Sequence, residues 1–424
     1  MSAPTRCTPA SELTEPLTDP LAEAIRGIDT TALDCVQVNA AVLADAAHGS
    51  GTHRELGGRL RFTTRSRTTG ALPTVEQQPV DQVRQLAGPL GLALDIGAPV
   101  TEGAALLDRL PADGGALYVV GDAYRMPWLP YHGHQHMDHS LLLRATDGGA
   151  RVEAVDAYDN ETPYGRAEPV ICSYERAQAA ALFDGAPAVP VSVRPLPGPG
   201  AAREPVARTL ARNAEDAALL LAGDAPERYA HAFRDLSDQS AACTALLLET
   251  WLLARSRRLH AAWVADRAPG SAHASAAAER AAAWDELAGQ CYLASRRVQR
   301  GRPVPPQIHT TLARLLRADA ELAVEAARTG SGDPMPDPAQ IRRTVTDTVA
   351  DVLGADPAAV AGTDDLSRLE GFASFQMVET VERLEDAYGV EFAPGDLQPA
   401  VLRSVDGLVG LVVRTTEGLE VAHS

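Results

Sequence analysis

The chain has 424 residues, 45% of them hydrophobic, and a formal net charge of −18, which is typical of a globular protein of two or three domains. All 38 basic residues are arginine, because the sequence contains no lysine. The missing lysine excludes a P-loop and Schiff-base chemistry, and the net negative charge argues against nucleic-acid binding.

The N-terminal segment Met1–Pro20 is polar and lacks a signal-peptide pattern. No run approaches the roughly 18 apolar residues that cross a bilayer. We therefore expect a flexible N-terminus over residues 1–20, no membrane contact and a cytoplasmic location. The five cysteines are scattered and have no CxxC spacing, which predicts neither a disulfide framework nor a zinc site.

Residues 21–195 carry a mixed pattern. Cys35–His48 has helical spacing, with an inward stripe of small and branched apolar residues. Three short apolar runs bounded by turn residues predict strands at Ala116–Val120, Ser140–Leu143 and Val152–Val155. This order predicts an α+β domain.

Residues 206–328 are rich in alanine and leucine at helical spacing and predict an all-α subdomain. Pro190–Pro205 is rich in proline and glycine and is interpreted as a linker, as are residues 329–338. Residues 339–418 then form a separate domain. It is acidic, since residues 337–424 contain 16 Asp and Glu against 6 Arg.

The motif Gly371–Glu379 (GFASFQMVE) places a serine at the start of an acidic helix. In that helix the apolar residues Met377, Val381 and Leu384 are expected to face the domain core, and the acidic residues Glu379, Glu382 and Glu385 are expected to face partners. The motif resembles acyl and peptidyl carrier proteins, which are all-α four-helix domains. The resemblance implies that Ser374 carries a covalent 4'-phosphopantetheine. A phosphopantetheinyl transferase and a carrier-loading enzyme would then be partners.

Two positions depart from the carrier pattern. Ala373 stands where the family usually has aspartate before the serine, and Phe375 replaces the following leucine. The alternative interpretation is a degenerate carrier domain that is never loaded.

Cys35 lies at the start of the first predicted helix, where the helix dipole favours a thiolate. About one hundred residues later, the histidine-rich stretch Tyr131–His139 (YHGHQHMDH) runs into a strand, and Asp156 ends the next strand. This order fits a cysteine nucleophile with His139 as base and Asp156 as the residue that orients the base.

Other assignments remain open from the residues alone. His136 could replace His139 as the base, and Asp159 could replace Asp156. Cys35 could also be a buried structural cysteine. The clustered histidines could bind a metal, but we expect none, because a His-x-His-x-His loop has no fixed geometry and no partner ligand at metal-site spacing.

The order of these residues resembles the papain-like clan, including the double-glycine leader peptidases. It resembles more closely the butirosin-type carrier-protein-dependent aminoglycoside acyltransferase family. The matching segments are Gly121–Asp122, Leu129–His132, His136–His139 and Val155–Asp156. The resemblance implies a papain-like fold with a helical C-terminal half, in which Cys35 is the nucleophile, His139 the base and Asp156 the orienting residue.

One feature of the leader peptidases is missing. They place a glutamine before the nucleophile to help hold the oxyanion, and Ile28–Leu33 contains none. Gln37 and Asn39 lie beyond Cys35 on its own helix and are poorly placed for this task. The backbone N–H of Cys35, together with a second donor that the sequence does not identify, is therefore expected to hold the oxyanion.

The combination predicts an enzyme of specialised metabolism, such as antibiotic biosynthesis. It would move an acyl or aminoacyl group from the arm on Ser374, via Cys35, to an amine of a small-molecule acceptor. A carrier on the same chain has a high effective concentration. The alternatives are a non-catalytic carrier platform that only binds substrate or partner enzymes, and a thioesterase that hydrolyses the carrier-bound acyl group.

Overall fold

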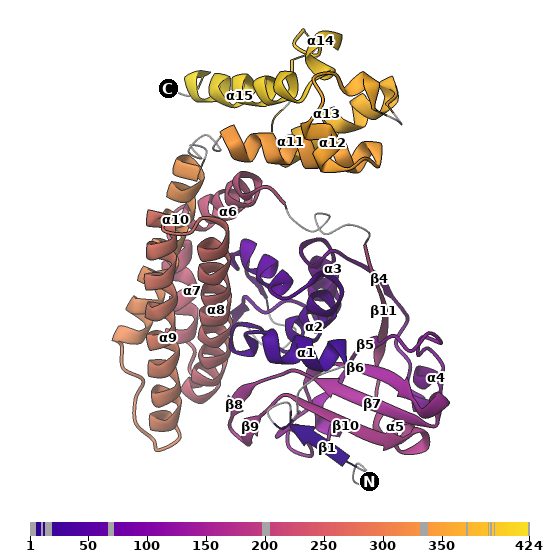
Figure 1. Ribbon diagram of the computed structural model, residues 1–424. Coiled ribbons are helices and arrows are strands. Elements are labelled where there is room, and N and C mark those ends of the chain that lie inside the picture. Colours follow the sequence, from indigo (N-terminus) through magenta and orange to yellow (C-terminus); the bar gives the residue numbers. More distant parts are fainter. Residues whose placement is uncertain are drawn as a thin grey trace. The chain divides into compact units, whose positions relative to one another are not determined.

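The computed structural model describes residues 6–9, 12, 19–66, 72–196, 204–330, 338–369, 372–388, 390, 392–393 and 395–422 (Figure 1). The chain divides into two compact units. The first contains Met1–Arg203 and Asp216–Leu322, and the second contains Glu204–Glu215 and Ala323–Ser424. Each is described by itself. Among the helices of the described segments, none has the length and apolarity needed to cross a membrane.

The first unit is built on an antiparallel sheet whose described strands have the order β1-β10-β7-β6-β5-β11-β4. The strands are β1 (Arg6–Pro9), β4 (Leu92–Ile96), β5 (Leu117–Asp122), β6 (Asp138–Thr146), β7 (Arg151–Asp156), β10 (Val170–Glu175) and β11 (Val189–Pro195). Shorter strands pair separately, β2 (Arg65–Ser66) with β3 (Pro73–Thr74) and β8 (Asn160–Thr162) with β9 (Gly165–Ala167). The three predicted strands are confirmed as β5, β6 and β7. These strands are neighbours in the sheet, and their apolar residues are buried in the core.

Two sequence predictions are wrong in this sheet. The linker expected from Pro190 begins too early, because Val189–Pro195 is β11 and pairs with both β4 and β5. The expected linker residues 197–203 lie outside the described residues. The N-terminus is not flexible over its whole length, because Arg6–Pro9 pairs with β10. Proline at the ends of these strands hid them from the sequence pattern.

Helices cover the sheet. They are α1 (Pro20–Gly27), α2 (Gln37–His48), α3 (Pro79–Leu90), α4 (Gly103–Leu107) and α5 (Arg176–Phe183). Helix α2 contacts β6 and β11, and α5 contacts β7 and β10. The inward stripe expected in α2 consists of Val38, Val42 and Ala46. Val38 and Val42 are fully buried and Ala46 is half-buried, but Asn39 on another face is also fully buried. The alanines of α2 let the sheet and neighbouring helices approach closely, so the buried surface is wider than the predicted stripe.

The expected all-α segment is helical through its described residues. Its helices are α6 (Val206–Leu221), α7 (Ala225–Arg234), α8 (Gln239–Arg267), α9 (Ala272–Val298) and α10 (Gln307–Gly330). A short turn makes α8 and α9 a helical hairpin, seen as long neighbouring ribbons in Figure 1.

Helix α8 also lies directly against the α/β part of its unit. It packs on the 3₁₀ helix Thr52–Gly58, where a Cβ on Gly57 would lie only 2.2 Å from the carbonyl oxygen of Leu259. Buried Glu249 accepts hydrogen bonds from the Thr74 hydroxyl (2.5 Å) and the Val75 N–H (2.7 Å). This close packing makes α8 a structural support of the α/β part.

The second unit contains α11 (Pro338–Leu353), α12 (Pro357–Ala361), α13 (Ser374–Tyr388), α14 (Pro399–Leu402) and α15 (Val405–Ala422). Its core is mostly aliphatic, also contains the buried aromatic residue Phe392, and includes Met377, Val381 and Leu384, as predicted. The expected linker residues 331–337 lie outside the described residues. The helical fold predicted for this domain is present.

A disulfide joins Cys7 on β1 to Cys172 on β10. The two residues are directly opposite each other in the antiparallel pair. The sequence prediction that the cysteines form no disulfide is therefore wrong for this pair. Since disulfides are rare in reducing compartments, the bond does not favour the expected cytoplasmic location.

Cys7→Ser is expected to lower the free energy of unfolding by about 2–4 kcal/mol, because it removes a crosslink between segments far apart in the chain. The side chain of Cys7 is exposed, so the substitution leaves no core cavity. Urea unfolding with and without dithiothreitol measures the effect. The wild type should lose stability on reduction and Cys7→Ser should not; equal wild-type midpoints would contradict the prediction.

Stability is also expected to fall at mildly acidic pH because of His260. Its buried ring bonds the carbonyl oxygen of Gly57 through Nδ1 (2.8 Å), and burial, reinforced by His273 and Arg257, lowers its pKa to about 3. In the unfolded chain His260 binds a proton near pH 6.5, whereas in the folded protein it stays neutral down to about pH 3. The free energy of unfolding therefore falls by about 1.4 kcal/mol for each pH unit between these two values as the pH is lowered.

The matched variant His260→Asn keeps a donor for Gly57 but cannot titrate. Urea midpoints at pH 7, 6 and 5 should fall more steeply for the wild type than for this variant. Parallel slopes would show that His260 is not the group responsible.

Candidate functional site

Cys35 lies in the turn that leads into α2, two residues before the helix begins at Gln37. The Asp34 carboxylate caps this turn by accepting the N–H groups of Val36 (3.0 Å) and Gln37 (2.9 Å). The side chain of Gln37 in turn accepts the N–H of Asp34 (3.1 Å), which completes a capping box. Gln37 is thus engaged in capping, and among the described residues the N–H of Cys35 has no hydrogen-bond partner.

The surroundings of Cys35 disfavour a free thiolate. Burial raises the pKa of its thiol well above the usual value, and the carboxylates of Asp34, Asp156 and Glu76 raise it further. The expectation that the helix start alone lowers this pKa is therefore wrong. The resting cysteine is a thiol, which needs a base before it can act as a nucleophile.

His139 is fully buried at the start of β6. Its Nε2 lies 2.8 Å from Oδ2 of Asp156, so this nitrogen carries the hydrogen and donates it to the carboxylate. Its Nδ1 is buried and has no hydrogen-bond partner among the described residues. This leaves Nδ1 as the nitrogen able to accept a proton.

Asp156 ends β7 and its carboxylate is held by several donors. Besides His139, they are the Trp128 indole (2.8 Å), the N–H of Tyr158 (3.0 Å) and the Asn39 amide (3.3 Å). Burial acts to raise the pKa of Asp156, but the charge and hydrogen bond of His139, with the other donors, lower it overall. The carboxylate is therefore ionised.

The cysteine is joined to the strand that carries His139. The Cys35 sulfur lies 3.8 Å from the carbonyl oxygen of Asp138, and the Ser140 hydroxyl donates to the carbonyl oxygen of Cys35. The Asn39 amide donates to the carbonyl oxygen of Ser140 (2.8 Å). The structure thus brings the three predicted residues together, with Cys35 against the two neighbours of His139.

The alternative residues lie elsewhere. His136 bonds Asp122 (2.6 Å), stacks on Tyr124 and is 73% exposed. Asp159 faces Arg166 (3.4 Å) and does not contact the buried histidine. His136 is thus paired with a different carboxylate from His139, and Asp159 is paired with an arginine.

The histidines do not converge on a metal position. His134 stacks on Tyr164, while His136 and His139 pair with different carboxylates. Within the described residues no group of three or more His, Cys, Asp or Glu side chains could hold a metal ion.

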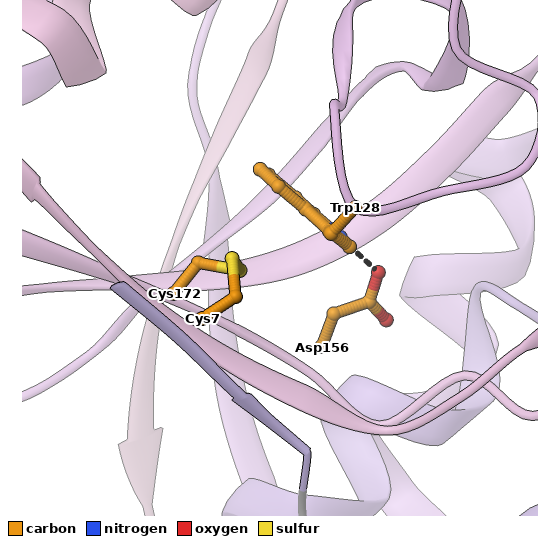
Figure 2. The surroundings of a disulfide bond; sticks show 4 residues. All are labelled: Cys7, Trp128, Asp156 and Cys172. Carbon is orange, nitrogen blue, oxygen red and sulfur yellow. Dashed lines mark hydrogen bonds between the residues drawn. A yellow bond between two sulfur atoms is a disulfide. The ribbon is translucent and has the colours of Figure 1, made fainter. Parts of the chain in front are cut away.

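Sequence reasoning missed Trp128 and the role of Asn39 as a donor to Asp156. Asn39 lies in the first turn of α2, four residues after Cys35, so the spacing could have indicated that the two residues are close. Trp128 comes from a loop and has no such signal. Figure 2 shows its indole directed at Asp156, next to the Cys7–Cys172 disulfide of the neighbouring strands.

In the second unit, helix α13 begins at Ser374, whose side chain lies outside the described residues. Ala373 precedes the helix, and its N–H donates to the side chain of Gln376 (2.8 Å). Near the helix start, Phe375 is 76% exposed and Val378 is 55% exposed. The two residues that flank the serine in the chain, Ala373 and Phe375, are thus both exposed.

Residues 343–412 match the family model of the phosphopantetheine attachment site. The second unit thus contains a carrier domain, where 4'-phosphopantetheine is attached covalently to a serine. The described residues fit this group, because the helix start presents its positive dipole end to a phosphodiester. The domain implies a phosphopantetheinyl transferase and carrier-loading enzymes as partners.

No curated protein matches the chain. The carrier match covers the C-terminal domain only. The resemblance of residues 21–195 to the butirosin-type family, and the papain-like fold it implies, stay predictions. The structure gives that part a mixed sheet and helix architecture.

The acidic face of the carrier helix is smaller than expected. Glu382 is exposed, but Glu379 pairs with Arg383 (2.7 Å) and Glu385 accepts the N–H of Phe392 (2.7 Å). The latter two glutamates are therefore partly engaged within the domain.

Ala373→Asp is expected to stabilise the carrier domain by about 1 kcal/mol. Ala373 stands at the N-cap position of α13, where an aspartate side chain would accept hydrogen bonds from first-turn N–H groups. The Gln376 half of the capping box is already present. Thermal unfolding measures this gain. Intact mass after incubation with coenzyme A and a broad phosphopantetheinyl transferase follows modification.

The wild type and Ala373→Asp should each gain one phosphopantetheine, and Ser374→Ala should gain none. Modification of Ser374→Ala would place the arm on another serine. An unmodified wild type alongside a modified Ala373→Asp would mean that alanine has impaired the site.

Proposed function

We propose that the α/β part is a cysteine-dependent acyltransferase of specialised metabolism, which moves an acyl or aminoacyl group from a phosphopantetheine thioester to an amine of a small molecule. The observation that carries this proposal is the buried His139–Asp156 pair beside Cys35, with Nδ1 of the histidine unpartnered among the described residues. Buried polar atoms are normally hydrogen-bonded, and an open nitrogen is what a general base needs.

The phosphopantetheine arm supplies the thiol on which the acyl group is carried as a thioester. Cys35 starts as a thiol, so Nδ1 of His139 takes its proton as the sulfur attacks the thioester carbonyl carbon. The bond from the Cys35 sulfur to this carbon forms and the bond to the donor sulfur breaks. The departing thiolate recovers the proton from His139.

The acceptor amine then attacks the acyl group on Cys35. A carbon–nitrogen bond forms, the bond from the carbon to the Cys35 sulfur breaks, and the amine proton passes through His139 to the sulfur. The ionised Asp156 stabilises the imidazolium in both halves. The N–H of Cys35, left open by the capping box, is suited to donate to the oxyanion.

Cys35→Ala is expected to abolish transfer and Asp156→Asn to slow it roughly 10⁴-fold, since an amide would favour the wrong histidine tautomer. The carrier is loaded from acetyl-coenzyme A with a broad phosphopantetheinyl transferase. Peptide mass mapping then follows acetyl groups on Cys35, and products are measured with a set of small diamines present. Ser374→Ala controls for direct acylation by acetyl-coenzyme A.

Each alternative predicts a different outcome. A non-catalytic platform predicts no acetyl group on Cys35 and no effect of Cys35→Ala. A thioesterase predicts acetate rather than an acetylated amine at every diamine concentration. Acylated Cys35 together with amide product supports the transferase.

A further inference from the structure

Arg255 of α8 is buried at the junction of two loops of the candidate site. Its Nη1 donates to the carbonyl oxygens of Thr30 (2.9 Å) and Leu33. Its Nη2 donates to the carbonyl oxygen of Asp159 (2.8 Å) and the side-chain oxygen of Asn160 (3.3 Å). The first loop leads into the candidate nucleophile, and the second follows the carboxylate that holds the histidine.

The guanidinium is held in this position from its own helix. Its Cζ lies 4.3 Å from the ring centre of Trp251, one helical turn earlier. The Trp251 indole also donates to the side-chain oxygen of Asn160 (3.0 Å). Trp251 and Arg255 therefore donate to the same side-chain oxygen of Asn160. Together with the stacking on Trp251, this shared acceptor holds the guanidinium in one orientation.

The positive charge of Arg255 is not neutralised by a direct partner. Among the described residues its hydrogen-bond acceptors are carbonyl and amide oxygens, not carboxylates. Burial lowers the pKa of Arg255. A buried cation without a paired anion is costly, and its field acts strongly on nearby groups at low dielectric.

The group that benefits from this field is the Cys35 thiol. The carboxylates of Asp34, Asp156 and Glu76 oppose formation of a thiolate, whereas Arg255 favours it. A sulfur that becomes negative during transfer must therefore overcome several anions, and the guanidinium acts against them.

The other titratable groups near the thiol do not supply a fixed charge. Burial raises the pKa of Tyr131 to about 12 and the pKa of Tyr158 well above its usual value, so both phenols stay neutral. His139 is the base that exchanges the proton.

We infer that Arg255 is a positioning residue that ties the loop before Cys35 to the loop after Asp156 and supplies the positive charge that the Cys35 thiolate requires. Its effect on transfer rests on the proposed acyltransferase function. Its effect on the thiol does not, because thiol ionisation can be measured in the absence of any transfer.

Nearby Arg258 provides a matched control. It lies on the same helix and donates to the carbonyl oxygen of Thr31 (2.8 Å), but it also pairs with Asp285 (2.6 Å) and is partly exposed. It thus touches the loop before Cys35 without linking the two loops.

The test uses the full chain as wild type, Arg255→Met, Arg255→Lys and Arg258→Met. The rate of iodoacetamide labelling of the Cys35 peptide is measured by mass spectrometry at a fixed pH of about 8, below the pKa of the thiol, with buried Cys243 and Cys291 as references. Arg255→Met should lower this rate about tenfold, because a pKa raised by about one unit leaves a tenth of the thiolate. Arg255→Lys keeps the charge and should label like the wild type, as should Arg258→Met.

Acetyl transfer from the loaded carrier gives the second readout. Both Arg255 variants should lose roughly ten- to hundredfold in rate, because neither methionine nor lysine can bond all the acceptors. Phosphopantetheine attachment to the carrier domain and circular dichroism report folding in each variant.

An unchanged labelling rate in folded Arg255→Met overturns the inference, as does an equal loss of rate in Arg258→Met. If Arg255→Met does not fold, wild-type transfer by Arg255→Lys overturns the positioning role. Should Cys35→Ala leave transfer intact, the proposed function fails on its own, and the labelling rates still decide the effect of Arg255 on the thiol.

Discussion

The buried carboxylate of Asp156 is the constraint on which the rest of the candidate site depends. An ionised group inside a protein is tolerated only when donors surround it, and losing one donor from such a set is strongly destabilising. Here the donors come from separate parts of the chain, namely Asn39 on α2, Trp128 on a loop and His139 on β6. The hydrogen bonds that stabilise the Asp156 carboxylate therefore also hold α2 and β6 in place relative to β7.

The helical segment extends this constraint outward. Glu249 joins α8 to β3, and Arg255 of the same helix joins the loops on either side of the cysteine and the carboxylate. Gly57 lets α8 approach closely enough for these contacts. Helix α8 carries no recognisable chemical motif, but its packing makes it part of the candidate site. The carrier domain belongs to the other compact unit and has its own hydrophobic core.

Sequence patterns predicted those helices and strands that are determined by interactions between residues close in the chain. The helix after Cys35, the strands around His139 and Asp156, and the carrier helix after Ser374 all follow from periodicity and end signals. The missed features depend on residues far apart in sequence. Cys7 and Cys172 are separated by 165 positions, and Arg255 and Leu33 by 222, so neither pairing leaves a spacing signal.

The raised pKa of Cys35 also explains how a thiol and a disulfide can share one unit. Thiol–disulfide exchange needs a thiolate as the attacking group, and burial with neighbouring carboxylates keeps the Cys35 sulfur protonated. The same protonation makes the thiol slow to oxidise. In the proposed mechanism Cys35 depends on His139 for each deprotonation, so a thiol that is protonated at rest is also a poor attacking group toward the Cys7–Cys172 bond of the same unit.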